Sequence, residues 1–153
     1  MPTISGFPCE KRHLGAFDII GYTKIVRSGG EMYDETRADG RWAALQAMAA
    51  GDKRIYGIAS HDKECPEDHY RYTVGIARDG DHADQLYSFH VKKSGWIVFS
   101  LDFERDYGKF WGSDPYKMTS ALGCKFNKAL GLHIDVYGSD YDGHAMEFWM
   151  PVR

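Results

Sequence analysis

Glu147 is the residue whose type and position point most directly to chemistry, because it is an acidic side chain in an apolar stretch near the C-terminus. Residues 144–152 read H-A-M-E-F-W-M-P-V, a pattern typical of a strand. Side chains alternate across a strand, so Glu147 and Trp149 share one face, while the apolar residues between and beside them share the other. We expect the second face to be core, and the first sets a carboxylate beside an indole.

A carboxylate that is buried without a partner costs on the order of several kcal/mol, so we expect a cation near Glu147. The cation is either an internal Lys or Arg side chain or a ligand that arrives from outside. The internal candidate is Arg71, which we expect on a neighbouring strand. If the cation is a ligand, Trp149 adds a cation–π attraction of about 0.5 to 2 kcal/mol, and the strand binds aromatic or lipophilic cations.

Composition predicts one compact domain over residues 1–153. The net charge of -3 argues against a nucleic-acid surface, which needs clustered Lys and Arg. No apolar run approaches the length of a membrane span, and the N-terminus has no signal-peptide pattern. We therefore expect a cytoplasmic protein that binds neither nucleic acid nor membrane.

Cysteine and histidine positions indicate neither a disulfide framework nor a metal site. The three cysteines are Cys9, Cys65 and Cys124, and their long spacings suit a reducing compartment. His61, Cys65 and His69 recur at intervals of four, but the charged residues between them favour a hairpin tip over a metal site. No phosphate-loop pattern follows Gly29 and Gly30, so we expect no metal and no cofactor.

The order of expected elements is the same in both halves of the chain. In the first half, a strand at 17–26 and a loop at 28–40 precede a helix at 41–50 and strands at 54–60 and 69–77. The second half starts with a short lead-in strand at 86–91 and a strand at 96–103, followed by a loop at 106–115. A helix at 116–130 comes next. Two strands, at 132–137 and 144–152, end the chain and are joined by a turn at 138–143.

Two β-α-β-β units, at about 10–78 and 86–153, predict an α+β fold with pseudo-two-fold symmetry. We expect one antiparallel sheet with two helices on one face. The other face, where the halves meet, would form an open ligand groove. Glu147 and Trp149 would point into that groove.

Six motifs run through nearly the whole chain in a recognisable order. They are G-A-F-D-I-I-G from Gly15, R-W-A-A-L from Arg41, Y-G-I-A from Tyr56, Y-T-V-G-I from Tyr72, S-G-W-I-V-F from Ser94 and E-F-W-M-P-V from Glu147. In these motifs the sequence resembles the GyrI-like small-molecule-binding domains, which are also the effector-binding domains of AraC-type and MerR-type multidrug-sensing transcription regulators.

The resemblance implies a duplicated fold with a central cleft and an acidic residue at its base. It assigns that acid to Glu147 and a pocket position to Trp149. It also implies aromatic walls, for which the matching positions are Tyr22, Tyr72, Trp96 and Trp111. The segment 102–114 departs from the family, because a longer aromatic and charged stretch replaces a short H-x-G turn.

The resemblance favours a stand-alone binding module that captures or senses lipophilic or aromatic cations such as dyes and antiseptics. The sequence ends at Arg153 without an expected helix-turn-helix, so any regulatory partner would be a separate protein. One alternative is a hydrolase of reactive cyclopropane-bearing compounds, with Glu147 as general acid and Tyr72, Tyr22 or Glu104 assisting. Another is a protein-binding inhibitor of the DNA gyrase type.

Overall fold

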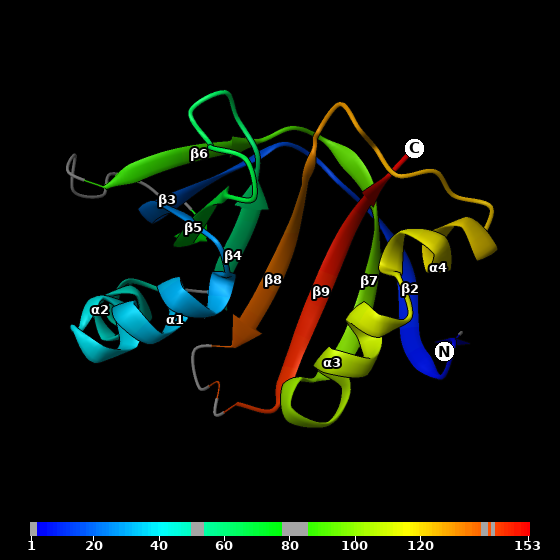
Figure 1. Ribbon diagram of the computed structural model, residues 1–153, viewed down its shortest axis with the longest axis horizontal. Helices are drawn as coiled ribbons and strands as arrows, with labels where there is room; N and C mark the ends of the chain where they lie inside the picture. The colour runs from blue at the N-terminus through cyan, green and yellow to red at the C-terminus, as the bar shows by residue number, and fades with distance from the viewer. Residues whose placement is uncertain (1–2, 50–53, 78–85, 139–140, 142) are drawn as a thin grey trace.

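The computed structural model describes residues 3–49, 54–77, 86–138, 141 and 143–153 (Figure 1). These residues form one antiparallel sheet of nine strands with four helices, which confirms the α+β class. The strands are β1 (Thr3–Ile4), β2 (Phe7–Leu14), β3 (Phe17–Val26), β4 (Arg54–Ser60), β5 (Tyr70–Ala77), β6 (Tyr87–Val91), β7 (Ser94–Asp102), β8 (Leu132–Gly138) and β9 (Ala145–Val152). The helices are α1 (Gly29–Ala38), α2 (Arg41–Met48), α3 (Phe103–Gly112) and α4 (Pro115–Ala121).

Seven strands lie within two residues of the ranges expected from sequence, and β2 was not expected at all. More buried and less buried residues alternate along β2, but its polar run 10–13 has no alternation of apolar and polar residue types from which a strand could be predicted. Residues 139, 140 and 142 of the expected turn at 138–143 lie outside the described chain. The repeat boundaries themselves stay a prediction.

Two segments that were expected to be loops are helices. The expected loop at 28–40 contains α1, which begins with a capping box. The Ser28 side chain accepts a hydrogen bond from the Gly30 N–H, and the Glu31 side chain accepts one from the Ser28 N–H. The expected loop at 106–115 is largely α3, capped by Asp102. The following helix, α4, ends at Ala121 rather than at residue 130, close to Gly123 with its φ of 73°.

The strand order is β1-β2-β7-β9-β8-β4-β5-β3-β6, which apart from β1 reads symmetrically about the β8–β4 pair. The lead-in strands are exchanged between the halves. β2 precedes β3 in the chain but pairs with β7, and β6 precedes β7 but pairs with β3. The halves are therefore joined by the central β4–β8 pairing and by both edge strands.

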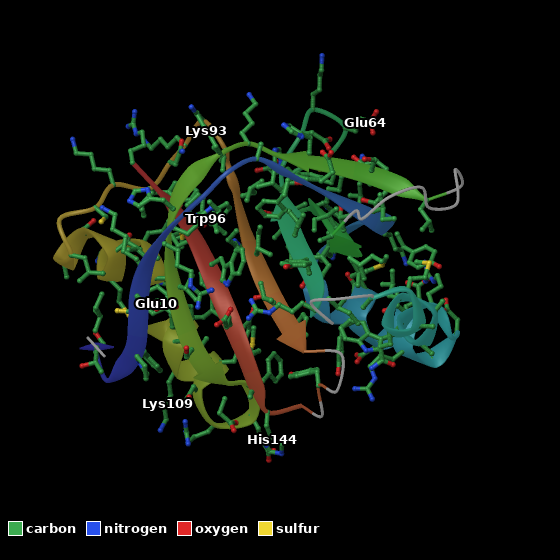
Figure 2. All side chains as sticks on the ribbon, turned by 180° about the vertical axis from the view of Figure 1, so that it is seen from behind. Glu10, Glu64, Lys93, Trp96, Lys109 and His144 are labelled. Carbon is green, nitrogen blue, oxygen red and sulfur yellow. The ribbon has the colours of Figure 1, made fainter. Side chains whose placement is uncertain are left out.

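Side chains of all four helices belong to one core on one face of the sheet, together with the inward residues of β2, β5, β7 and β9. In Figure 1, α1 and α2 lie to one side and α3 and α4 to the other, with β8 visible between the pairs. Figure 2 shows the opposite face, where a second core contains Tyr56, Trp96, Val98 and Trp149. Among the described residues, no helix is long and apolar enough to cross a membrane.

Candidate ligand-binding site

A cavity of about 580 Å³ opens on the helix-covered face, between α1 and α3 and above β5, β4 and β8. Its lining residues are Ser28, Gly29, Gly30, Tyr33, Ala59, Ser60, His61, Tyr70, Tyr72, Phe103, Tyr107, Trp111, Tyr116, Phe126, Gly131, Leu132, His133, Asp135, Tyr137 and Tyr141. Half of them are Phe, Tyr or Trp, so the walls offer flat apolar faces for stacking. The volume is within the range of small-molecule sites.

Asp135 lies at the floor of this cavity. It is in the middle of β8, beside Gly57 of β4 and Phe148 of β9, and its residue is 4% exposed. Each carboxylate oxygen accepts one phenolic hydrogen bond: Oδ2 from Tyr72 at 2.8 Å and Oδ1 from Tyr107 at 3.2 Å. Tyr72 comes from β5 and Tyr107 from α3, while Asp135 itself is on β8. Three elements therefore meet at one carboxylate.

Burial changes the ionisation of the groups around this floor. Desolvation raises the pKa of Asp135 to about 6, and the two tyrosine hydrogen bonds act in the opposite direction because they favour the charged form. Burial also raises the pKa of Tyr72 and Tyr107, so both remain hydrogen-bond donors. The pKa of His133 is lowered by desolvation to about 4. At neutral pH the floor therefore carries one negative charge among neutral rings.

The walls and the mouth of the cavity come mostly from α1 and from the α3–α4 segment. Phe103 and Tyr107 of α3 stack with ring centroids 4.6 Å apart, and Trp111 lies 5.3 Å from the His133 ring. Phe103 and Tyr116 are the most exposed of these rings, at 40% and 41%, and they lie at the mouth. The segment 102–114, in which the sequence departs from the family pattern, thus supplies much of the cavity wall.

The described residues that line the cavity include no Lys and no Arg. Asp135 is also the one charged residue among the fully buried side chains of the described chain. A buried carboxylate without a cationic partner is destabilising. Among the described residues, the hydrogen bonds to Asp135 come from two neutral phenols, and the cavity lining supplies no countercation.

Glu147 lies on the helix-free face, as the sequence predicted, but its environment is the opposite of that of Asp135; its ligand-binding role stays a prediction. It lies on the face of the sheet away from the helices, where a shallow open hollow is lined partly by Arg54 and Ser100. Its carboxylate accepts from Arg12 at 3.3 Å, from Arg54 at 3.4 Å and from the Trp149 indole N–H at 3.0 Å. The cation that the sequence predicted beside Glu147 is therefore supplied by the chain.

The internal partner of Glu147 is not Arg71. Arg71 instead binds Asp62 at 2.7 Å and Glu64 at 2.8 Å, in the hairpin between β4 and β5. The reason is the strand order, since β4 and β8 separate the β5 strand of Arg71 from the β9 strand of Glu147.

The structure does not bring the six expected ligand-binding residues together. Tyr72 and Trp111 line the cavity. Trp96 and Trp149 are buried on the opposite face, with ring centroids 5.9 Å apart, and Figure 2 shows Trp96 from that side. Tyr22 lies on β3, where its ring is 5.3 Å from the guanidinium of Arg41.

Asp135 was missed, although the reasoning applied to Glu147 applies equally to it. It is a carboxylate within the run Leu132 to Tyr137, between Ile134 and Val136. Alternation places it on the same face as His133 and Tyr137. That signal was available in the sequence. Glu104, the other acid considered for catalysis, is exposed on α3, where one carboxylate oxygen is 3.7 Å from His144.

No protein-family model and no curated protein matches the sequence, but solved structures match the fold. A protein of Staphylococcus aureus MU50 that is assigned a role in bacterial transcription regulation has a TM-score of 0.74 at 15% identity, covering 97% of this chain and 99% of that chain. SAV2435 bound to tetraphenylphosphonium also has a TM-score of 0.74 at 15% identity, with coverages of 95% and 94%. A hydrolase from Listeria innocua has a TM-score of 0.59 at 9% identity, with coverages of 95% and 91%.

At such low identities these matches establish the fold and nothing finer. The neighbours span the whole chain, and they include a structure that carries a lipophilic cation. The chain has the fold of these solved structures.

Proposed function

We propose that the protein is a GyrI-like effector-binding domain that captures or senses lipophilic aromatic cations in the cavity above Asp135. The observation that carries the proposal is the buried, ionisable Asp135 in an aromatic cavity whose described lining has no Lys or Arg. A cation in the cavity would provide the missing countercharge, and the rings would add stacking and cation–π attraction. The ligand seen in one structural neighbour, tetraphenylphosphonium, belongs to this chemical class.

The hydrogen bonds to Asp135 favour a particular kind of cation. Tyr72 and Tyr107 each occupy one carboxylate oxygen, so an ammonium group that needs several new acceptors finds few of them here. A permanent or delocalised cation without N–H donors loses little hydration on entering and still gains the attraction of the charge. Quaternary ammonium and phosphonium compounds and cationic dyes should therefore bind more tightly than primary amines of similar size.

Isothermal titration with tetraphenylphosphonium tests the proposal, with triphenylphosphine oxide as a neutral comparison. We expect a Kd in the micromolar range, which corresponds to about -8 kcal/mol. The Asp135→Asn substitution should weaken phosphonium binding by about tenfold or more, which is about 1.4 kcal/mol, and should leave the weak binding of the neutral compound unchanged.

Glu147→Gln is the matched control, because it removes a carboxylate from the other face of the same sheet. We expect its Kd to equal that of the wild type. If Glu147→Gln weakens binding and Asp135→Asn does not, the cavity is not the site and the original assignment to Glu147 is restored.

Hydrolysis is a second candidate, favoured by the combination of a carboxyl group with a pKa of about 6 and two phenol groups on one floor. In this version protonated Asp135, rather than Glu147, would be the general acid. Turnover would then fall as pH rises through 6, whereas cation affinity would rise. We expect a cyclopropane-bearing electrophile to be recovered unchanged, as measured by mass spectrometry. Conversion that is lost in Asp135→Asn would show a hydrolase instead.

Inhibition of DNA gyrase stays a prediction without a supporting contact.

A further inference from the structure

The Tyr72 side chain reaches Asp135 by lying across a strand at a glycine. Tyr72 is on β5 and Asp135 is on β8, with β4 between them. The β4 residue at the crossing is Gly57, which pairs with Val74 on one side and with Asp135 on the other. The phenol passes over Gly57 and places its oxygen 2.8 Å from the carboxylate.

The space above Gly57 is fully used by this ring. A Cβ atom at position 57 would lie 2.0 Å from the Tyr72 hydroxyl oxygen and 2.6 Å from Cζ. Both distances are far below contact, so no other residue fits while the phenol is in place. The opposite edge of the ring is confined by Gly29 of α1, where a Cβ would lie 2.9 Å from Cε2.

We propose that Gly57 is a positioning residue of the binding site: its missing side chain creates the channel across β4 through which Tyr72 delivers its hydroxyl group to Asp135. Gly29 closes the channel from the helix side. The positioning of Tyr72 by Gly57 is a property of the free protein. Its effect on ligand binding rests on the proposed function.

The test is the titration of the Asp135 carboxyl group, followed by NMR in the ligand-free protein. The other titratable residues that line the cavity with Asp135 are Tyr33, His61, Tyr70, Tyr72, Tyr107, Tyr116, His133, Tyr137 and Tyr141. Burial raises the pKa of Tyr70, Tyr72, Tyr107, Tyr137 and Tyr141 and lowers that of His133 to about 4, so none of these six groups changes charge near pH 6. The signal of the Asp135 carboxyl carbon is followed directly.

Gly57→Ala should displace the phenol and thereby remove a hydrogen bond to the charged carboxylate. The titration midpoint should rise by about one pH unit, as expected for the loss of one such bond. Tyr72→Phe should raise it equally, and the double variant should show no further rise. Gly15→Ala is the matched control, because a Cβ there has no described atom within 4 Å, and its midpoint should equal that of the wild type.

Gly57→Ala is expected to be destabilising, so a second measurement separates the ring from the backbone. Replacing Tyr72 by Leu removes the hydroxyl oxygen and the two ring carbons that lie closest to position 57. In the Tyr72→Leu background, Gly57→Ala should lower the melting temperature much less than in the wild type. An unchanged midpoint in folded Gly57→Ala, or an equal loss of melting temperature in both backgrounds, would overturn the proposal.

The two proposals can fail separately. If the midpoint shifts as expected and tetraphenylphosphonium does not bind, Gly57 positions Tyr72 and the proposed function is wrong. If binding is seen and the midpoint does not move, the function stands and the positioning role is rejected.

Discussion

At Asp135, the charged state is stabilised only by two neutral hydroxyl groups. At Glu147, the same kind of group has two arginines and an indole N–H. The two carboxylates lie on neighbouring strands but on opposite faces of the sheet. Under the proposed function, this difference in partners, rather than in residue type, is the reason that a cation from outside would bind at Asp135 and not at Glu147.

The affinity for a permanent cation should depend on pH through Asp135. The carboxyl group has a pKa of about 6 in the free protein, and the cation binds its ionised form. Affinity should be constant above that pH and fall by up to about tenfold per pH unit below it, until the lower pKa of the complex is reached. Tetraphenylphosphonium titrations across this range check the slope, and Asp135→Asn should show a flat profile. A flat wild-type profile would show that the charge of Asp135 is not used.

The same carboxylate should make the protein less stable at neutral pH. Its folded-state pKa of about 6 lies above the ordinary value of 3.8, so between these values the folded state binds more protons than the unfolded state. Stability is then lost as pH rises, by up to roughly 3 kcal/mol. Urea denaturation of wild type and Asp135→Asn should give a difference that grows in favour of the variant from about pH 4 to about pH 7. A constant difference would contradict the raised pKa.

The sequence indicated the chemistry of the site more accurately than its position. A carboxylate among aromatics, with Tyr72 and Trp111 nearby, is what the structure contains. Alternation placed Glu147 on the helix-free face, as observed, but it could not show that the aromatic cavity lies on the other face, above Asp135. A ligand-binding role of Glu147 stays a prediction. The contacts of Phe148 with Phe110 and Trp111 of α3 agree with the expected alternation, in which Glu147 faces away from the helices.

At the scale of elements, α1 contributes to the site through its first turn. Ser28 caps the helix, and the next residue, Gly29, packs against the Tyr72 ring. Ser28→Ala should therefore reduce the free energy of unfolding by about 1 kcal/mol. Chemical denaturation measures this, with the exposed Ser88→Ala on β6 as the control. Equal effects of the two substitutions would show that the cap contributes nothing specific.

Strands were easier to predict than helices for a physical reason. The strands have regular apolar patterns, and their expected ranges match the structure closely. In α1, by contrast, Met32 and Thr36 are the buried residues, so apolar periodicity is weak and the helix depends on its cap. In α3, Phe103, Tyr107 and Phe110 do follow helical spacing, but the charged residues and Gly108 suggested a loop.

At the scale of the whole molecule, the exchanged strands β2 and β6 connect the halves. β2 from the first half pairs with β7 of the second half, and β6 from the second half pairs with β3 of the first half, so the loss of either strand leaves a strand of the other half unpaired on one side. In addition, β4 pairs with β8 along seven residues. We expect unfolding to be a single cooperative transition. Far-UV circular dichroism and tryptophan fluorescence should give superimposable urea curves, and two separated transitions would show that the halves unfold independently.

The symmetric arrangement also explains where the cavity lies. Doubling of a β-α-β-β order was visible in the sequence, and it predicted a ligand groove on the helix-free face where the two halves meet. The sequence could not show that each half carries two helices on the same face, with the groove between the helix pairs rather than on the bare face. That outcome depends on packing between residues far apart in the chain.

The most direct test of this account is a crystal structure of the complex with tetraphenylphosphonium. We predict that the phenyl groups lie between α1 and α3, in contact with Tyr72 and Trp111, and that the phosphonium charge lies above Asp135. Glu147 should keep its pairs with Arg12 and Arg54. A ligand bound against Glu147 and Trp149 on the opposite face, with those arginines displaced, would contradict the account.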